Sequence, residues 1–178
     1  MERCFSSVGA CGIDCGLCPR YYTQGESKCP GCGGLDFNLK HPSCKILTCV
    51  TRDHQVSICS ECSEFPCEII ASWDKADSFV SHQNCLTNLH FIKNFGYLPY
   101  LETQNIRMNL LKQLLSDYDD GRSKSFYCLA TTLLSMDSLK TLQSFINDPK
   151  EIKSPKALHE LINSLATKET IILKLRKS

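Results

Sequence analysis

The stretch CGIDCGLCPRYY, residues 11–22, places Cys11, Cys15 and Cys18 within eight positions. Three thiols so close in sequence can form a disulfide, bind zinc or hold an iron–sulfur cluster. The choice among these three decides how the first part of the chain folds, because the residues that follow are also rich in cysteine.

The cysteines are concentrated in one part of the chain. Of the 13 cysteines among 178 residues, ten lie between Cys11 and Cys67, a segment with only thirteen other apolar or aromatic residues. Burying so few side chains does not offset a backbone entropy cost of about 1–2 kcal/mol per residue. A structural zinc ion supplies an apparent ~10–16 kcal/mol in small peptides. We therefore predict that residues 1–70 form a small metal-stabilised module of zinc-knuckle type with little regular structure.

The cellular compartment bears on the state of these thiols. The N-terminal residues MERCFSSVGACG lack the apolar region of a signal peptide, and no run approaches the ~20 apolar residues that span a bilayer. The sequence thus predicts a cytoplasmic protein that does not enter a membrane. Thiols stay reduced in the cytosol, so metal binding is favoured over a disulfide framework.

Three CxxC pairs indicate the metal ligands, because the turn of a CxxC pair lets two sulfurs bind one tetrahedral ion. We expect about two zinc ions, the first held by Cys15, Cys18, Cys29 and Cys32. The second would take four of the next five cysteines, although alternate pairs could share an ion instead. Cys11 is the least certain ligand, and His41 and His54 are weaker candidates. The candidate metal ligands are Cys11, Cys15, Cys18, Cys29, Cys32, Cys44, Cys49, Cys59, Cys62 and Cys67.

Iron is the alternative to zinc. Cys-x3-Cys-x2-Cys is the spacing by which radical SAM enzymes hold a four-iron cluster, but the rest of this chain lacks the alternating strands and helices of their barrel. Rubredoxin-type iron needs the same paired turns as zinc. An iron–sulfur or thiol-redox protein therefore stays open as the second interpretation.

The charge of the module argues against nucleic acid as a partner. Residues 1–70 hold six Lys and Arg against eight Asp and Glu, a net charge of −2, and four thiolates around a zinc ion add further negative charge. Neutralising phosphates requires the opposite sign. We expect no nucleic-acid binding and leave a protein partner open.

In order, the segments CGIDCGLCPRYY, CPGC, CKILTC and CSECSEFPCEII resemble a prokaryotic cysteine-rich family catalogued as a domain of unknown function. The resemblance spans residue 11 to about residue 70. It implies metal binding and no established reaction. The sequence departs from the family pattern at Leu47, where an arginine is usual, and at Val50, where alanine is usual.

The remaining residues, 71–178, read as a mostly α-helical domain. The sequence predicts a first helix over EFPCEIIASWDKA with Pro66 in its first turn, a helix ended by Gly96, and a helix that stops at Gly121. Asp137 and Ser154 are the expected caps of the last two helices. The tail TIILKLRKS reads as a short edge strand or a frayed end. The expected core stripe of the third helix is Ile106, Leu110, Leu111, Leu114 and Leu115.

One segment outside the cysteine cluster could carry chemistry. Arg122, Lys124 and Ser125 precede an apolar helical run, and a helix N-terminus with nearby cations can bind an anion and lower the pKa of Cys128. The competing interpretation is an ordinary helix start with Cys128 facing the core.

Four thiolates around zinc leave no open position, so a hydrolase is disfavoured. The function predicted from sequence is a cytosolic zinc-binding scaffold or partner-binding module, which is not itself a demonstrated enzyme. The alternatives are an iron–sulfur or thiol-redox protein, and an enzyme that uses the segment at Arg122 and Lys124.

Overall fold

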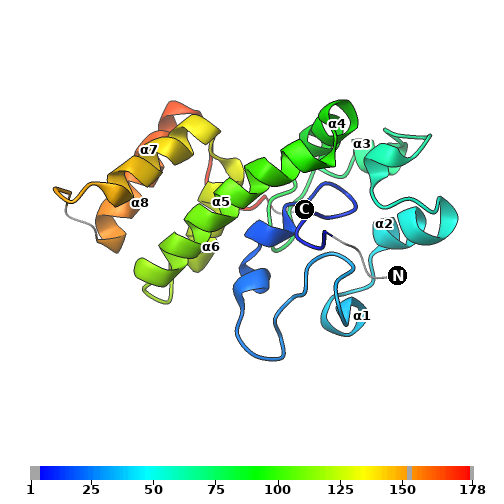
Figure 1. Ribbon diagram of the computed structural model, residues 1–178, viewed down its shortest axis with the longest axis horizontal. Coiled ribbons are helices and arrows are strands. Elements are labelled where there is room, and N and C mark those ends of the chain that lie inside the picture. Colours follow the sequence, from blue (N-terminus) through cyan, green and yellow to red (C-terminus); the bar gives the residue numbers. More distant parts are fainter. Residues whose placement is uncertain (1–4, 152–153, 177–178) are drawn as a thin grey trace.

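The computed structural model of the chain describes residues 5–151 and 154–176, and these residues form helices, turns and irregular segments without a strand. The long helix α5 (Tyr97–Asp117) runs diagonally across the molecule (Figure 1). The cysteine-rich residues lie at one end and the last three helices at the other. None of the helices in the described ranges is long and apolar enough to cross a bilayer.

The cysteine-rich end is built from single turns of helix. Because its residues are rich in glycine and cysteine, it contains no helix longer than five residues within the described part of the chain. Its elements are η1 (Cys15–Leu17), η2 (Pro19–Tyr22), α1 (Phe37–Lys40), α2 (Lys45–Thr48), η3 (Cys49–Asp53), η4 (Cys59–Glu61) and α3 (Glu68–Ala71).

Longer helices begin at residue 85, as the sequence pattern predicts. They are α4 (Cys85–Phe95), α5, α6 (Lys124–Leu133), α7 (Met136–Asn147) and α8 (Pro155–Lys168). Gly96 follows α4 with a φ of 89°, a conformation that favours glycine. Ser154 caps α8 as expected, because its side chain accepts a hydrogen bond from the Ala157 N–H at 3.1 Å.

Several details of these predictions are wrong. α3 is only four residues long and begins after Pro66. It ends at Ala71, where the chain turns and the Ser72 hydroxyl donates a hydrogen bond back to the Glu68 carbonyl. α5 ends at Asp117, before Gly121. The cap of α7 is Ser135, whose hydroxyl accepts from the Ser138 N–H, and Asp137 lies inside the first turn.

The predicted core stripe of α5 is confirmed for Leu110, Leu111 and Leu114, which are buried. It is wrong for Ile106, which is 55% exposed. The first half of α5 faces inward through Tyr100 and Gln104. Ile106 lies two residues after Gln104, a rotation of about 200° around the helix, so it faces solvent. The polar residue Gln104 takes the inward position that an apolar pattern would not assign to it.

The packing joins the two parts of the sequence. One buried cluster holds α5 to α8 together through residues such as Leu111, Leu142 and Ile162, and it includes Leu17 from η1. A second cluster combines Val8, Ile46, Val50, Ile58, Phe65 and Ile70 of the cysteine-rich end with Leu89, Ile92 and Tyr100. The amino-acid composition therefore changes near residue 70, but each of the two buried clusters contains residues from both sides of that position.

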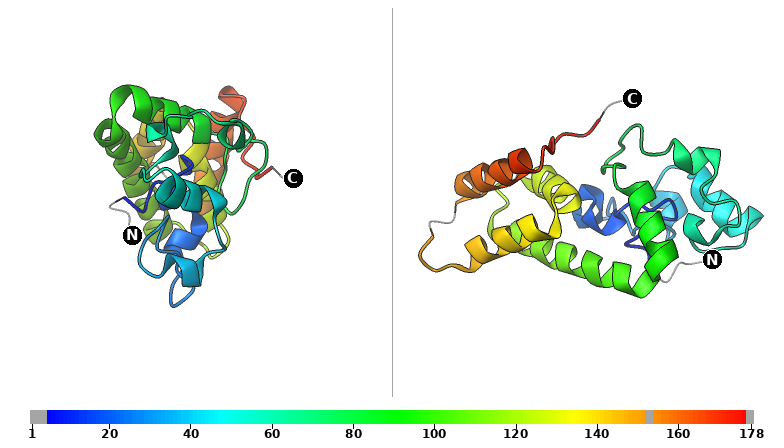
Figure 2. Two further views of the ribbon diagram at one scale, coloured as in Figure 1. Left: turned by 90° about the vertical axis from the view of Figure 1, so that its right-hand side faces the viewer. Right: turned by 90° about the horizontal axis from the view of Figure 1, so that it is seen from above.

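The segment after α8 forms neither a strand nor a further helix over residues 171–176; residues 177–178 of the expected strand lie outside the described residues. It runs from α8 back toward the cysteine-rich end (Figure 2). There the Asp77 N–H donates to the Arg176 carbonyl at 3.1 Å, and the Arg176 N–H donates to the Asp77 carboxylate at 2.7 Å.

Candidate metal centre

Six cysteines surround one cavity at the cysteine-rich end. The cavity has a volume of about 320 Å³, and its wall includes Cys11, Cys15, Cys18, Cys29, Cys32 and Cys44. These residues come from the opening stretch with η1, from the CPGC turn and from the residue before α2. The fold thus gathers thiols that are more than thirty positions apart in sequence.

Backbone hydrogen bonds connect the CPGC turn to the opening stretch. The Cys32 N–H donates to the Ser6 carbonyl at 2.7 Å, and the Ala10 N–H donates to the Cys32 sulfur at 3.4 Å. Gly31 has a φ of 84°, and a Cβ at this position would lie 2.2 Å from the Ser6 oxygen. The glycine of the turn is therefore required by both its backbone conformation and this close approach.

Cys15 lies among the other thiols of this first group. Burial raises the pKa of Cys15 well above its ordinary value, and negative charge on Cys32, Cys11, Cys18 and Cys29 raises it further. These sulfurs are thus close enough to oppose one another's ionisation. A cation bound among them would relieve that repulsion and favour the thiolate forms.

A second group contains Cys49, Cys59, Cys62 and Cys67. Burial raises the pKa of Cys59 to about 12, with further contributions from the charges of Cys11, Cys67, Cys49 and Cys62. The pKa of Cys49 is likewise raised, first by burial and then by nearby acids that include Cys62 and Cys67. The one-turn helix α2 separates Cys44, on the cavity, from Cys49 in this second group.

Cys11 differs from the other thiols of the cavity. The Cys85 thiol, at the start of α4, hydrogen-bonds to Cys11 and lowers its pKa, while burial opposes this effect and the Ile13 N–H adds to it. The same contact raises the pKa of Cys85. The sequence indicates only a buried small residue at Cys85, because nothing local pairs it with a thiol 74 positions away.

The side chains do not form a closed ligand set. Within residues 5–151 and 154–176, no three or more His, Cys, Asp or Glu side chains are positioned to hold a metal ion. A tetrahedral zinc site with Zn–S distances of about 2.3 Å would bring its sulfurs to about 3.8 Å from one another. Zinc-knuckle geometry at either group accordingly stays a prediction.

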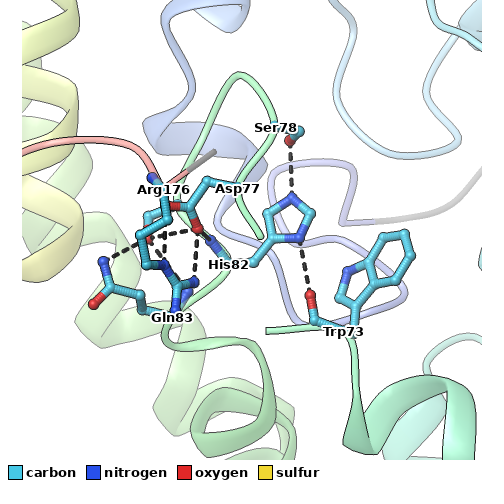
Figure 3. A network of polar contacts seen from close by, with 7 residues as sticks. Trp73, Asp77, Ser78, His82, Gln83 and Arg176 are labelled. Atoms are coloured by element: carbon cyan, nitrogen blue, oxygen red, sulfur yellow. Dashed lines mark hydrogen bonds and ion pairs between the residues drawn. The ribbon is translucent and has the colours of Figure 1, made fainter. Parts of the chain in front are cut away.

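Part of the cavity wall is the loop between α3 and α4, which contributes Trp73, Ser78 and His82. Figure 3 shows the His82 ring between two partners: its Nδ1 lies 3.2 Å from the Trp73 carbonyl and its Nε2 lies 2.9 Å from the Ser78 hydroxyl. Trp73 stacks on the same ring with centroids 5.3 Å apart. His82 therefore supports the wall with both ring nitrogens already in use.

Asp77 anchors this wall loop to the C-terminal segment. Its carboxylate accepts hydrogen bonds from the His82 N–H at 2.8 Å, from the Arg176 N–H and from the Arg176 guanidinium, whose Nη2 lies at 2.8 Å (Figure 3). Burial alone would raise the pKa of Asp77, but these hydrogen bonds and the charge of Arg176 lower it to about 2. We refer to the Asp77–Arg176 contact as the clasp.

The comparison with protein families covers this end of the molecule. Residues 7–72 match the model of a family described as "Protein of unknown function (DUF3795)". We refer to residues 7–72 as the DUF3795 segment. The resemblance drawn from the sequence motifs is thereby confirmed at the level of the family. No curated protein and no solved structure matches the chain.

The DUF3795 segment and the loop between α3 and α4 meet at the cavity. The segment supplies all six cysteines of the cavity, whereas Trp73, Ser78 and His82 lie beyond residue 72. Residues outside the family match therefore complete the wall of the cavity.

Asp14, in the opening motif of the DUF3795 segment, belongs to a buried polar network. Its carboxylate accepts hydrogen bonds from the Tyr100 hydroxyl at 2.5 Å and from the Asn88 amide at 3.2 Å, and Gln104 donates to the Tyr100 oxygen at 3.1 Å. Burial raises the pKa of Asp14, whereas Tyr100, Arg107 and Asn88 act to lower it. The sequence shows the aspartate between two cysteines but gives no sign of its partners on α4 and α5.

The turn that leads into α6 is bonded to the protein's own carboxylate. Asp120 Oδ1 accepts hydrogen bonds from the Arg122 N–H and the Ser123 N–H, each at 3.0 Å, and from the Ser123 hydroxyl at 2.9 Å. Arg122 and Ser125 line a separate cavity of about 410 Å³, whereas Lys124 does not.

Cys128 also lines this second cavity but is only 2% exposed. Burial raises its pKa to about 12, with a further contribution from the charge of Cys18. This is opposite to the lowered pKa that a reactive thiol at an anion site requires. The geometry favours the interpretation of this run as an ordinary helix start.

Proposed function

We propose that the protein is a cytosolic metal-binding scaffold in which two groups of cysteine thiolates hold metal and cross-link the DUF3795 segment. The observation that supports this proposal is the division of the ten clustered cysteines. Six surround one cavity, and Cys49, Cys59, Cys62 and Cys67 form a second group. Zinc is the metal we propose for the second group, because four thiolates are the ligand set of a closed structural zinc site.

The residues present fit a thiolate-bound metal in their donor chemistry. Backbone N–H groups point at the sulfurs, as from Ala10 to Cys32 and from Leu47 to Cys44 at 3.5 Å, and such donors stabilise thiolate charge. Arg20 and Lys45 line the cavity and partly balance the charge of several thiolates. When bound, the ions would neutralise the thiolates and tie together the loops that carry them.

A structural role follows from the ligand set and from the size of the core. A zinc ion with four protein thiolates keeps no position for water or substrate. The cysteine-rich end shares a cluster of thirteen buried residues with α4 and the start of α5, and Cys11, Cys32 and Cys59 are among them. The metal would fix the thiols of this end in place, so its removal should unfold residues 5–70 before the helices of the opposite end.

The test compares Cys62→Ser, in the second group, with Cys128→Ala in the helical core. Cys62→Ser should lose about one zinc ion per chain in native mass spectrometry, whereas Cys128→Ala should keep its metal and lose only stability. A strong chelator should abolish protection from hydrogen exchange over residues 5–70 while α5 to α8 stay protected. Full metal retention by Cys62→Ser, or uniform unfolding of the whole chain on chelation, would contradict the proposal.

A further inference from the structure

The first cysteine group lines an open cavity. We propose that it holds a four-iron, four-sulfide cluster bound by Cys15, Cys18, Cys29 and Cys32, in place of a single zinc ion. This inference rests on the proposed function and specifies the metal of one of its two groups.

Size is the first argument. Four sulfurs around one zinc ion lie about 3.8 Å apart and leave no space between them for a water-sized probe. The cavity of about 320 Å³ is far larger than the roughly 10–15 Å³ that a single water molecule needs. A cuboidal iron–sulfur cluster places eight inorganic atoms inside its four thiolates, so it needs such an interior.

The surroundings of the thiols are the second argument. Ile13, Phe37 and Val80 contribute to an apolar wall, and Trp73 and His82 close it on the side of the clasp. Burial and N–H bonds to sulfur are the features by which a protein tunes an iron–sulfur cluster. The bond from Ala10 to the Cys32 sulfur is of this kind.

The choice of four ligands follows from the contacts of the six thiols. Cys15 and Cys18 flank η1, and Cys29 and Cys32 flank the CPGC turn, whose backbone is fixed against Ser6 and Arg20. Cys11 is engaged by the Cys85 thiol, and Cys44, just before α2, belongs to neither CxxC pair. The two paired turns therefore supply the ligands, and Cys11 and Cys44 complete the wall.

Charge balance is compatible with this cavity. Two ferrous and two ferric ions, four sulfides and four cysteine thiolates leave two negative charges in excess, and the four thiol protons pass to solvent. Assembly from iron in these two states and sulfide requires no further oxidant. The positive side chains of Arg20 and Lys45, both on the cavity wall, offset the excess charge.

The experiment uses the full chain purified without oxygen, or reconstituted with ferrous and ferric iron and sulfide and then desalted. We expect about four iron and about four acid-labile sulfide per chain, with broad visible absorption that bleaches on reduction. Cys32→Ser should lose more than about 90% of the iron and sulfide. Cys62→Ser, the same change in the second group, should keep both and lose zinc.

The outcomes separate this inference from the proposed function. Two zinc ions per chain without sulfide would overturn the cluster and leave metal binding intact. Iron and sulfide that disappear in Cys62→Ser and persist in Cys32→Ser would also overturn it. Less than one metal ion of any kind per chain would overturn both proposals. The helix signal in circular dichroism, which comes mainly from α4–α8, checks in each variant that the loss of iron is not a loss of fold.

Discussion

Replacing Asp77 with asparagine tests how much the clasp contributes to stability. The side chain of Asp77 is 0% exposed, and that of its partner Arg176 is 38% exposed. Asp77→Asn keeps the shape of the side chain and removes its charge, so the guanidinium loses its ion pair. The wall loop that carries His82 then loses its strongest link to the C-terminal segment.

The magnitude follows from the pKa of Asp77, which falls from an ordinary 3.8 to about 2. A difference of one pKa unit corresponds to about 1.36 kcal/mol, which gives roughly 2.5 kcal/mol before screening. Because Arg176 is partly exposed to solvent, we expect a loss of about 1–2 kcal/mol at pH 7. The contribution is complete above the unfolded-state pKa near 4 and disappears as the pH falls through about 2.

Urea unfolding followed by helix circular dichroism at pH 7, 5, 3 and 2 measures this difference. Metal release at low pH affects wild-type and variant alike, so the difference between them isolates Asp77. Asp137→Asn is the matched control, because Asp137 is 92% exposed and its pair with Lys140 should contribute at most about 0.5 kcal/mol. Equal losses in the two variants at pH 7, or a loss in Asp77→Asn that persists at pH 2, would refute the reasoning.

Three further changes test other parts of the structure. Gly31→Ala should cost more than about 2 kcal/mol in urea unfolding and lower the metal content. Gly25→Ala, whose Cβ meets nothing within 4 Å, should cost only about 1–2 kcal/mol. Equal effects of the two variants would contradict the close approach of Gly31 to Ser6. Tyr100→Phe removes a donor from the buried Asp14 carboxylate and should cost about 1.5–3 kcal/mol in the same assay, with a loss below about 0.5 kcal/mol as the contrary result. Cys128 should alkylate more than about 100-fold more slowly than a free cysteine at pH 8, because burial raises its pKa to about 12. Rapid modification, followed by mass spectrometry, would restore the reactive-thiol interpretation.

The helices from residue 85 onward could be predicted because their signals are local. Gly96 and Ser154 act within one turn of the helices that they end or begin, and the apolar repeat of Leu110, Leu111 and Leu114 faces one direction. The cap at Ser135 was missed because Asp137 offered an equally good local signal.

The long-range contacts around the candidate site could not be predicted from local patterns. Asp77 and Arg176 are 99 positions apart, and Asp14 and Tyr100 are 86 positions apart. Spacing favours Cys15, Cys18, Cys29 and Cys32 as one set, and the fold brings these thiols to one cavity. The metal that they bind stays a prediction, because CxxC turns serve zinc and iron alike.

The clasp also has a consequence for the order of events on the ribosome. Arg176 is synthesised 99 residues after Asp77, which corresponds to about 5–20 s of translation at about 5–20 residues per second. During that interval the cysteines of the cavity have been made while the loop carrying Trp73 and His82 lacks its bonds to Arg176. We expect this loop to reach its final position only when Arg176 pairs with Asp77, which would leave the nascent thiols accessible to incoming metal until late in synthesis.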